Sequence, residues 1–233
     1  MTQKIVSRAE WLEARKAFLL KEKEFNKTRD DLAAQRRELP MVKIDQDYTF
    51  MSNDGAKSLS DLFGDKSQLI VYHFMFGKDW EEGCPSCSYL ADNFNGIDGH
   101  LGARDASLVC ISNASLDKLN GYKKRLGWSF NWVSAENNNF GNDFGVTFPD
   151  SKANDDGSGY NYTDKVFGEE MPGISVFQKM DDGTICHSYS TFGRGLDMMI
   201  GSYHFIDLTP KGRDEGDLPF SMSWIRRNDS YAN

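Results

Sequence analysis

Residues 68–96 constrain the fold of this chain more than any other part of its sequence. The segment Gln68–Phe76 is apolar and rich in β-branched and aromatic residues, which predicts a buried strand. A polar break from Gly77 to Gly83 follows, and Cys84-Pro-Ser-Cys87 then leads into residues whose apolar spacing fits one face of a helix. The sequence therefore predicts two cysteines where a strand and a short loop meet a helix N-terminus.

This position favours redox chemistry at the two cysteines. The unpaired amides and positive dipole end of a helix N-terminus favour a thiolate over a thiol, which lowers the pKa of a cysteine. Pro85 lacks an amide hydrogen and suits the first helical turn. Cys87 follows Cys84 by one turn, close enough to resolve a mixed disulfide. We therefore interpret Cys84 and Cys87 as a redox-active pair.

Two other interpretations of the pair stay open. A Cys-x-x-Cys can be half of a zinc site, but the sequence has no second such pair and no His-x-x-x-His. Cys110 and Cys186 stand alone in apolar, strand-like runs, as small buried cysteines often do. The pair could also be inert. We expect no metal and no organic cofactor.

Composition excludes several classes of function. The chain has 233 residues, 39% of them hydrophobic, and a net charge of −8. This acidity argues against nucleic acid and against anionic membranes as partners. No apolar run approaches the ~20 residues of a membrane-spanning helix, and the charged N-terminus does not resemble a signal peptide. Four cysteines without a secretion signal suggest a reducing compartment, so we expect a cytoplasmic protein.

The N-terminal residues predict a long charged helix over residues 7–39. Ser7 followed by Glu10 is a capping-box signature, and Pro40 ends the helix. An apolar stripe recurs at seven-residue intervals, at Trp11, Phe18, Phe25 and Leu32. The stripe needs a partner surface, which is either the same helix in a second copy of the chain or the main domain. A homodimer through this helix is slightly favoured.

The rest of the chain alternates strands and helices. After a strand over residues 41–51 and a short helix over 57–63, the predicted order is strand 68–76, helix, strand 106–112, helix 116–126 and strand 128–134. This order implies a sheet with parallel pairs and right-handed crossovers. Residues 135–170 are polar and suggest a loop that covers substrate. A proline-led strand 172–179, an Asp-Asp-Gly hairpin turn, a strand 184–190 and a helix 196–205 complete the pattern.

This arrangement resembles the thioredoxin fold, an α/β fold with a central mixed sheet flanked by helices. The resemblance implies that Cys84 attacks a disulfide and Cys87 resolves the product. It also implies that Met171-Pro172 is a cis peptide bond beside the pair, and that Met171, Pro172 and Trp80 contact substrate. We expect a helical extension at residues 1–40, a thioredoxin-like domain at 41–206, and a tail at 207–233 packed on that domain.

The whole chain is more closely similar to a bacterial thioredoxin-like family known only as a domain of unknown function. That family is related to the alkyl hydroperoxide reductase and thiol-specific antioxidant group. The resemblance covers nearly all of residues 7–231. It is carried by residues 72–76, 79–88, 91–96, 122–128, Tyr189-Ser-Thr191, 194–197 and Asp207-Leu-Thr-Pro210.

Three features depart from the related families. Thioredoxins have a tryptophan just before the first cysteine, where this chain has Gly83, with Trp80 three residues earlier in the loop. Glu81 and Glu82 oppose a thiolate while the helix dipole favours it, which leaves the sign of the pKa shift open. The Pro and Thr that precede a peroxidatic cysteine are absent from residues 79–83, so a peroxidase is less favoured.

The sequence thus predicts a thiol–disulfide oxidoreductase whose partner is a protein or small-molecule thiol or disulfide. The alternative is a non-catalytic thioredoxin-fold binding module in which Cys84 and Cys87 stay reduced or serve a structural role.

Overall fold

The computed structural model describes residues 3–154 and 156–231, and it divides the chain into two units at Pro40 and Met41. The first unit contains helix α1 (Arg8–Arg36). Its N-terminus has the predicted capping box: the Glu10 amide donates to Ser7 Oγ at 3.3 Å, and the Ser7 amide donates to Glu10 Oε2 at 2.9 Å. The predicted helix and its capping residue Ser7 are therefore confirmed, but the helix ends at Arg36, three residues before the predicted end.

The apolar stripe of α1 is exposed within this unit. Phe18 is 56% exposed and Phe25 66% exposed, and Trp11 and Leu32 are also exposed. A homodimer through this helix remains a prediction. None of the described helices is long and apolar enough to cross a lipid bilayer.

The second unit contains an eight-stranded mixed sheet in the order β1-β8-β7-β4-β5-β6-β2-β3. Strands β4, β5 and β6 run parallel, and every other pair is antiparallel. The strands are β1 (Val42–Lys43), β2 (Thr49–Ser52), β3 (Gly55–Ser58), β4 (Gln68–His73), β5 (Ala106–Ser112), β6 (Asn131–Ser134), β7 (Gly173–Lys179) and β8 (Ile185–Phe192).

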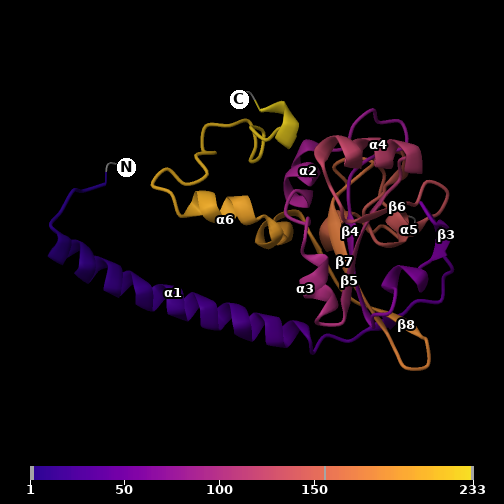
Figure 1. Cartoon of the computed structure of the whole chain (residues 1–233), viewed down its shortest axis with the longest axis horizontal. Coiled ribbons are helices and arrows are strands. Elements are labelled where there is room, and N and C mark those ends of the chain that lie inside the picture. The colour runs from indigo at the N-terminus through magenta and orange to yellow at the C-terminus, as the bar shows by residue number, and fades with distance from the viewer. Residues whose placement is uncertain (1–2, 155, 232–233) are drawn as a thin grey trace. The chain divides into compact units, whose positions relative to one another are not determined.

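Helices cover both faces of this sheet (Figure 1). The α-helices of this unit are α2 (Pro85–Ala91), α3 (Asp98–Gly102), α4 (Leu116–Leu126), α5 (Phe140–Asp143) and α6 (Gly201–Asp207). The 3-10 helices are η1 (Asp61–Phe63), η2 (Pro149–Ser151), η3 (Tyr160–Tyr162), η4 (Gly193–Met199) and η5 (Asn228–Ser230). Side chains of α2, α4 and α6 share one hydrophobic core, and those of η1 and α5 share the other.

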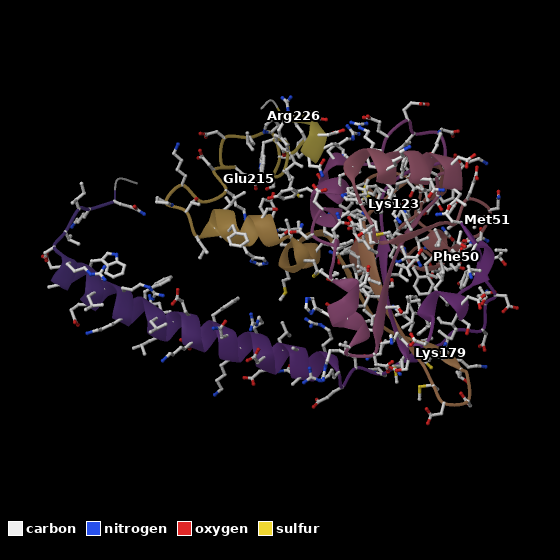
Figure 2. All side chains as sticks on the ribbon, viewed as in Figure 1. Phe50, Met51, Lys123, Lys179, Glu215 and Arg226 are labelled. Atoms are coloured by element: carbon white, nitrogen blue, oxygen red, sulfur yellow. The ribbon has the colours of Figure 1, made fainter. Side chains whose placement is uncertain are left out.

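Successive side chains along a strand point to opposite faces of the sheet, so apolar residues of one strand pack into both cores. Tyr72 of β4 packs into the same core as Cys87, whereas its neighbour Val71 packs into the opposite core. Strand β2, which lies between β6 and the edge strand β3, has one buried face. Its Phe50 is fully buried and its Met51 is exposed; Figure 2 labels both. The sheet is therefore buried on both faces at its centre, as expected for parallel strands joined by crossover helices.

The central part of the sheet has thioredoxin topology. The unit β4-α2-β5 is a parallel crossover, and β7-β8-α6 follows as an antiparallel pair and a helix. Because β7 runs antiparallel to β4, the start of β7 and the end of β4 lie at the same sheet edge, with Gly173 opposite His73. The loop before α2 begins at this edge.

Several predicted elements differ from those observed. The expected strand over residues 41–51 is two short strands, β1 and β2. The expected helix over 57–63 is wrong in its first half, because residues 55–58 pair with β2 and the Asp61 carboxylate accepts from the Ser58 amide at 2.8 Å. The expected helix 196–205 is divided at Ile200 into η4 and α6. The polar segment 135–170 contains α5, η2 and η3, and its residue 155 lies outside the described residues.

Candidate active site

The two cysteines lie where the sequence predicts them, at the junction of a loop and helix α2. Cys84 is the N-cap residue, with φ −57° and ψ 132°, and Pro85 occupies the first helical position. The Cys84 amide donates to Met75 O at 3.0 Å, which ties the start of α2 to the residues just after β4. Cys84 is half-buried, Cys87 is buried, and both are free thiols.

The environments of the two sulfur atoms differ strongly. The Cys84 sulfur accepts hydrogen bonds from the Cys87 thiol and from the amides of Cys87 and Ser86, and together they lower the pKa of Cys84 to about 6 despite its partial burial. Burial raises the pKa of Cys87, and donation to Cys84 raises it further. At neutral pH the pair is therefore set up as one thiolate and one buried thiol.

Tyr72, on β4, is a neighbour of Cys87. Its hydroxyl hydrogen-bonds the Cys87 sulfur and partly offsets the rise in the pKa of Cys87. Burial raises the pKa of Tyr72 itself, so this hydroxyl remains a donor at physiological pH. Cys87 therefore has a permanent hydrogen-bond donor beside it.

The charge of Glu82 is neutralised by two arginines. Arg227, in the C-terminal segment, pairs with Glu82 at 2.7 Å, and Arg125 of α4 pairs with it from the other side. Glu81 is exposed to solvent. The sign of the pKa shift, which the sequence left open, is a lowering: the hydrogen bond from Cys87 is its largest cause, and the charge of Arg227 contributes to it.

Gly83 has no room for the tryptophan that thioredoxins have at this place. A Cβ there would lie 2.6 Å from Cε1 of Phe74 and 3.1 Å from Cε1 of Tyr122. Trp80 takes a different position, against Gly77 and beside a cavity of about 430 Å³. Most residues that line this cavity are polar or charged, and the lining includes Trp80, Asn113, Glu136, Asn142, Thr147 and Glu170.

Met171 and Pro172 lie directly before β7, at the sheet edge where β4 ends. Met171 lines a small hollow together with His73 and Glu170. The Pro172 carbonyl accepts a hydrogen bond from the Tyr160 hydroxyl at 2.7 Å. The structure thus places both residues at the expected edge. Their contact with a substrate stays a prediction.

The predicted cis bond is wrong: the described residues contain no cis peptide, and Met171-Pro172 is trans. The extended trans chain forms backbone hydrogen bonds here: the Met171 amide donates to Val146 O at 2.8 Å, and residues 170 and 147 form a β-bridge. The trans form is intrinsically favoured by about 0.5–1 kcal/mol. No interaction in this segment requires the less stable isomer.

Two titratable groups lie near this edge, the buried His73 and the half-buried Glu170. His73 hydrogen-bonds Ser175 Oγ at 2.8 Å, and burial lowers its pKa to about 3, which makes it a neutral core histidine. Glu170 was not foreseen. Burial raises the pKa of its carboxyl to about 7, although Asn113 donates to it at 2.8 Å.

Sequence reasoning missed three residues around the site: Glu170, Tyr122 and Arg227. Glu170 stands in a polar segment that carries no sign of burial. Tyr122 lies within the predicted helix 116–126, where its spacing indicates only a helix face. Arg227 lies 140 residues beyond Cys87 with no motif around it. Among the described residues, no group of three or more His, Cys, Asp or Glu is arranged to hold a metal ion.

Comparison with solved structures gives similar chains of low sequence identity. Peroxidoxin BcpB from Mycobacterium tuberculosis is 14% identical with a TM-score of 0.47, covering 72% of this chain and 97% of that one. PrxQ of Xylella fastidiosa is 13% identical with a TM-score of 0.46, covering 71% and 94%. Peroxiredoxin Q of Xanthomonas campestris is 14% identical with a TM-score of 0.46, covering 72% and 96%.

Comparison with curated proteins gives no match. Residues 1–231, nearly the whole sequence, match the family described as "Bacterial protein of unknown function (DUF899)". The chain therefore belongs to that family.

Proposed function

We propose that this protein is a thiol–disulfide oxidoreductase in which Cys84 attacks and Cys87 resolves. The observation that carries the proposal is the asymmetry of the pair. Cys84 is half-buried and its sulfur accepts three hydrogen bonds, whereas Cys87 is buried and donates to it. A nucleophile needs an accessible thiolate at neutral pH, and a resolving thiol needs protection from other reactions. The two environments meet these needs.

The exchange proceeds in two balanced steps. The Cys84 thiolate attacks one sulfur of a substrate disulfide, forms a mixed disulfide and releases the other sulfur as a thiolate, which takes a proton from solvent. The Cys87 thiol then loses its proton to solvent, attacks the Cys84 sulfur and releases the second substrate thiol. The substrate gains two electrons, and the Cys84–Cys87 dithiol becomes a disulfide that an external dithiol must reduce.

Substrate contacts are proposed for the residues at the same sheet edge. Trp80 borders the polar cavity of about 430 Å³, which could hold part of a substrate next to the cysteine loop. Met171 and Pro172 precede β7 and offer an apolar surface. These three residues are the proposed substrate-binding set, and the substrate is a protein or small-molecule disulfide.

The test is a redox titration with alkylation trapping and intact mass analysis in glutathione buffers of graded potential. We expect a Cys84–Cys87 disulfide with a midpoint between about −120 and −270 mV, the range of dedicated exchangers. Cys186→Ser is the matched control, because Cys186 is also half-buried but lies on β8. This variant should titrate like the wild type.

Cys84→Ser and Cys87→Ser should each abolish the intramolecular disulfide, and Cys87→Ser should accumulate a mixed disulfide on Cys84. If no Cys84–Cys87 disulfide forms at any potential, the proposal fails. A binding module with a permanently reduced pair would then replace it, and metal analysis of the purified protein would report a zinc site.

A further inference from the structure

Arg227 contacts the cysteine loop through all three of its guanidinium nitrogens. Its Nη2 donates to the Gly83 carbonyl at 2.8 Å, its Nε donates to the Tyr122 hydroxyl at 2.8 Å, and its Nη1 pairs with Glu82 at 2.7 Å. Gly83 is the residue before Cys84 in the sequence. A planar guanidinium can bind these diverging acceptors together, which a lysine ammonium on its single nitrogen cannot reproduce.

Other contacts fix the C-terminal segment on either side of Arg227. Ile225, two residues earlier, is buried in the core that also contains Cys87. Asp229, two residues later, accepts from Arg125 of α4 at 2.6 and 3.1 Å. Figure 1 shows this segment, in yellow, beside α2 and α4. Contacts two residues before and two residues after Arg227 therefore hold it at the cysteine loop.

The electrostatic consequence concerns Glu82, two residues before Cys84. An unpaired carboxylate there disfavours a thiolate, and the positive charge of Arg227 favours one. Arg227 is the better buried of the two arginines, since its side chain is 19% exposed and that of Arg125 is 39% exposed. Its pairing is accordingly the less screened by solvent.

We propose that Arg227 is a positioning residue for Cys84, holding the Gly83 carbonyl in place and neutralising Glu82 so that the loop presents an accessible thiolate. The inference rests on the proposed function for its biological meaning. Its physical content, the effect of the C-terminal segment on the Cys84 thiol, can be measured without any substrate.

The test compares Arg227→Gln with Arg226→Gln. The two variants lose the same charge at adjacent positions, and Arg226 is exposed on the C-terminal segment, where Figure 2 labels it. The rate of Cys84 alkylation by iodoacetamide is followed from pH 4 to pH 9 by peptide mass spectrometry. We expect a midpoint near the wild-type value for Arg226→Gln and a rise of roughly half a pH unit for Arg227→Gln. Below the midpoint this means about threefold less thiolate.

Two further variants separate charge from position. Arg227→Lys keeps the charge but loses the forked contact, so its midpoint should lie between those of the wild type and Arg227→Gln. Adding Glu82→Gln to Arg227→Gln should return part of the shift, because the carboxylate is then absent. Arg227→Lys also keeps the test decisive if thermal unfolding shows that Arg227→Gln is misfolded.

Equal midpoints for Arg227→Gln and Arg226→Gln would overturn this inference, and so would full rescue by Arg227→Lys, which would leave only a charge effect. The proposed function fails on a different result, the absence of a Cys84–Cys87 disulfide in the redox titration. A shifted midpoint without that disulfide would retain the role of Arg227 and reject the exchange reaction.

Discussion

Replacing Gly83 by alanine should destabilise the folded protein, because two buried rings occupy the space that a Cβ needs. That Cβ would lie 2.6 Å from Cε1 and 2.9 Å from Cζ of Phe74, and 3.1 Å from Cε1 of Tyr122. Phe74 is 2% exposed and Tyr122 5% exposed. The Tyr122 hydroxyl is also bound by Ser88 and Arg227. Neither ring can move without displacing its neighbours.

The expected loss follows from two opposing effects. Overpacking a dense core costs about 1–3 kcal/mol, and the smaller conformational freedom of alanine in the unfolded chain returns about 0.4–1 kcal/mol. The net destabilisation should be about 1–2 kcal/mol. In a protein of this size each kcal/mol lowers the melting temperature by about 2–4 °C. Near-ultraviolet circular dichroism during heating measures this, because it reports the packing of aromatic rings.

Gly121→Ala is the matched control. Gly121 lies inside α4, is exposed, and has no atom within 4 Å of an added Cβ. Alanine there should stabilise the helix by up to ~1 kcal/mol, so the two substitutions are expected to have opposite signs. If Gly83→Ala melts at or above the wild-type temperature, the steric explanation for the missing tryptophan is wrong.

Two predictions concern buried groups near the pair. Because burial raises the pKa of Glu170 from 4.5 to about 7, the folded state binds this proton more tightly than the unfolded chain, and stability falls as the pH rises through this range. Glu170→Gln should remove this loss of stability and be more stable than the wild type at pH 8 by ~2 kcal/mol. Urea unfolding at pH 5 and pH 8 tests this. If the variant loses as much unfolding free energy between the two pH values as the wild type, the prediction is contradicted. Tyr72→Phe removes the hydroxyl beside Cys87, which should slow resolution about fivefold for a loss of ~1 kcal/mol. With Ellman's reagent, the second equivalent of released thiolate should slow and the first should not; equal slowing of both would contradict this role for Tyr72.

The sequence was sufficient for the parts of the fold that depend on local pattern. The strand predicted over 68–76 is present as Gln68–His73, and the cysteines lie at a helix N-terminus, as the hydrophobic run and a proline at the first helical position predict. Helix α4 ends as expected at Gly127, which has φ +69°. The hairpin turn before β8 has Gly183 at φ +85°. In each case the deciding interactions lie within a few residues along the chain.

Predictions failed where a distant contact decides the local conformation. The predicted helix over residues 57–63 loses its start, because pairing with β2 draws residues 57 and 58 into a hairpin at the sheet edge. The peptide before Pro172 has the position of a cis bond in thioredoxins, yet Val146 and Tyr160 hold the extended trans chain there. The buried state of Glu170 depends on Asn113, which is 57 residues away. None of these partners is marked by a local motif.

The direction of the pKa shift of Cys84 could not be predicted from the sequence, because it depends on how the side chains around the sulfur are placed. The hydrogen bond from the buried Cys87 thiol contributes most to the lowered pKa, and the amides of Cys87 and Ser86 add to it. Arg227 adds a positive charge from the C-terminal segment, where it also pairs with Glu82. Without the C-terminal segment, Glu82 would keep only the more exposed arginine. The Gly83 carbonyl would keep only the 3.3 Å hydrogen bond from Tyr122. The thioredoxin topology thus supplies both the cysteine pair and the hydrogen bonds that lower the pKa of Cys84 most, and the C-terminal segment adds the charge of Arg227.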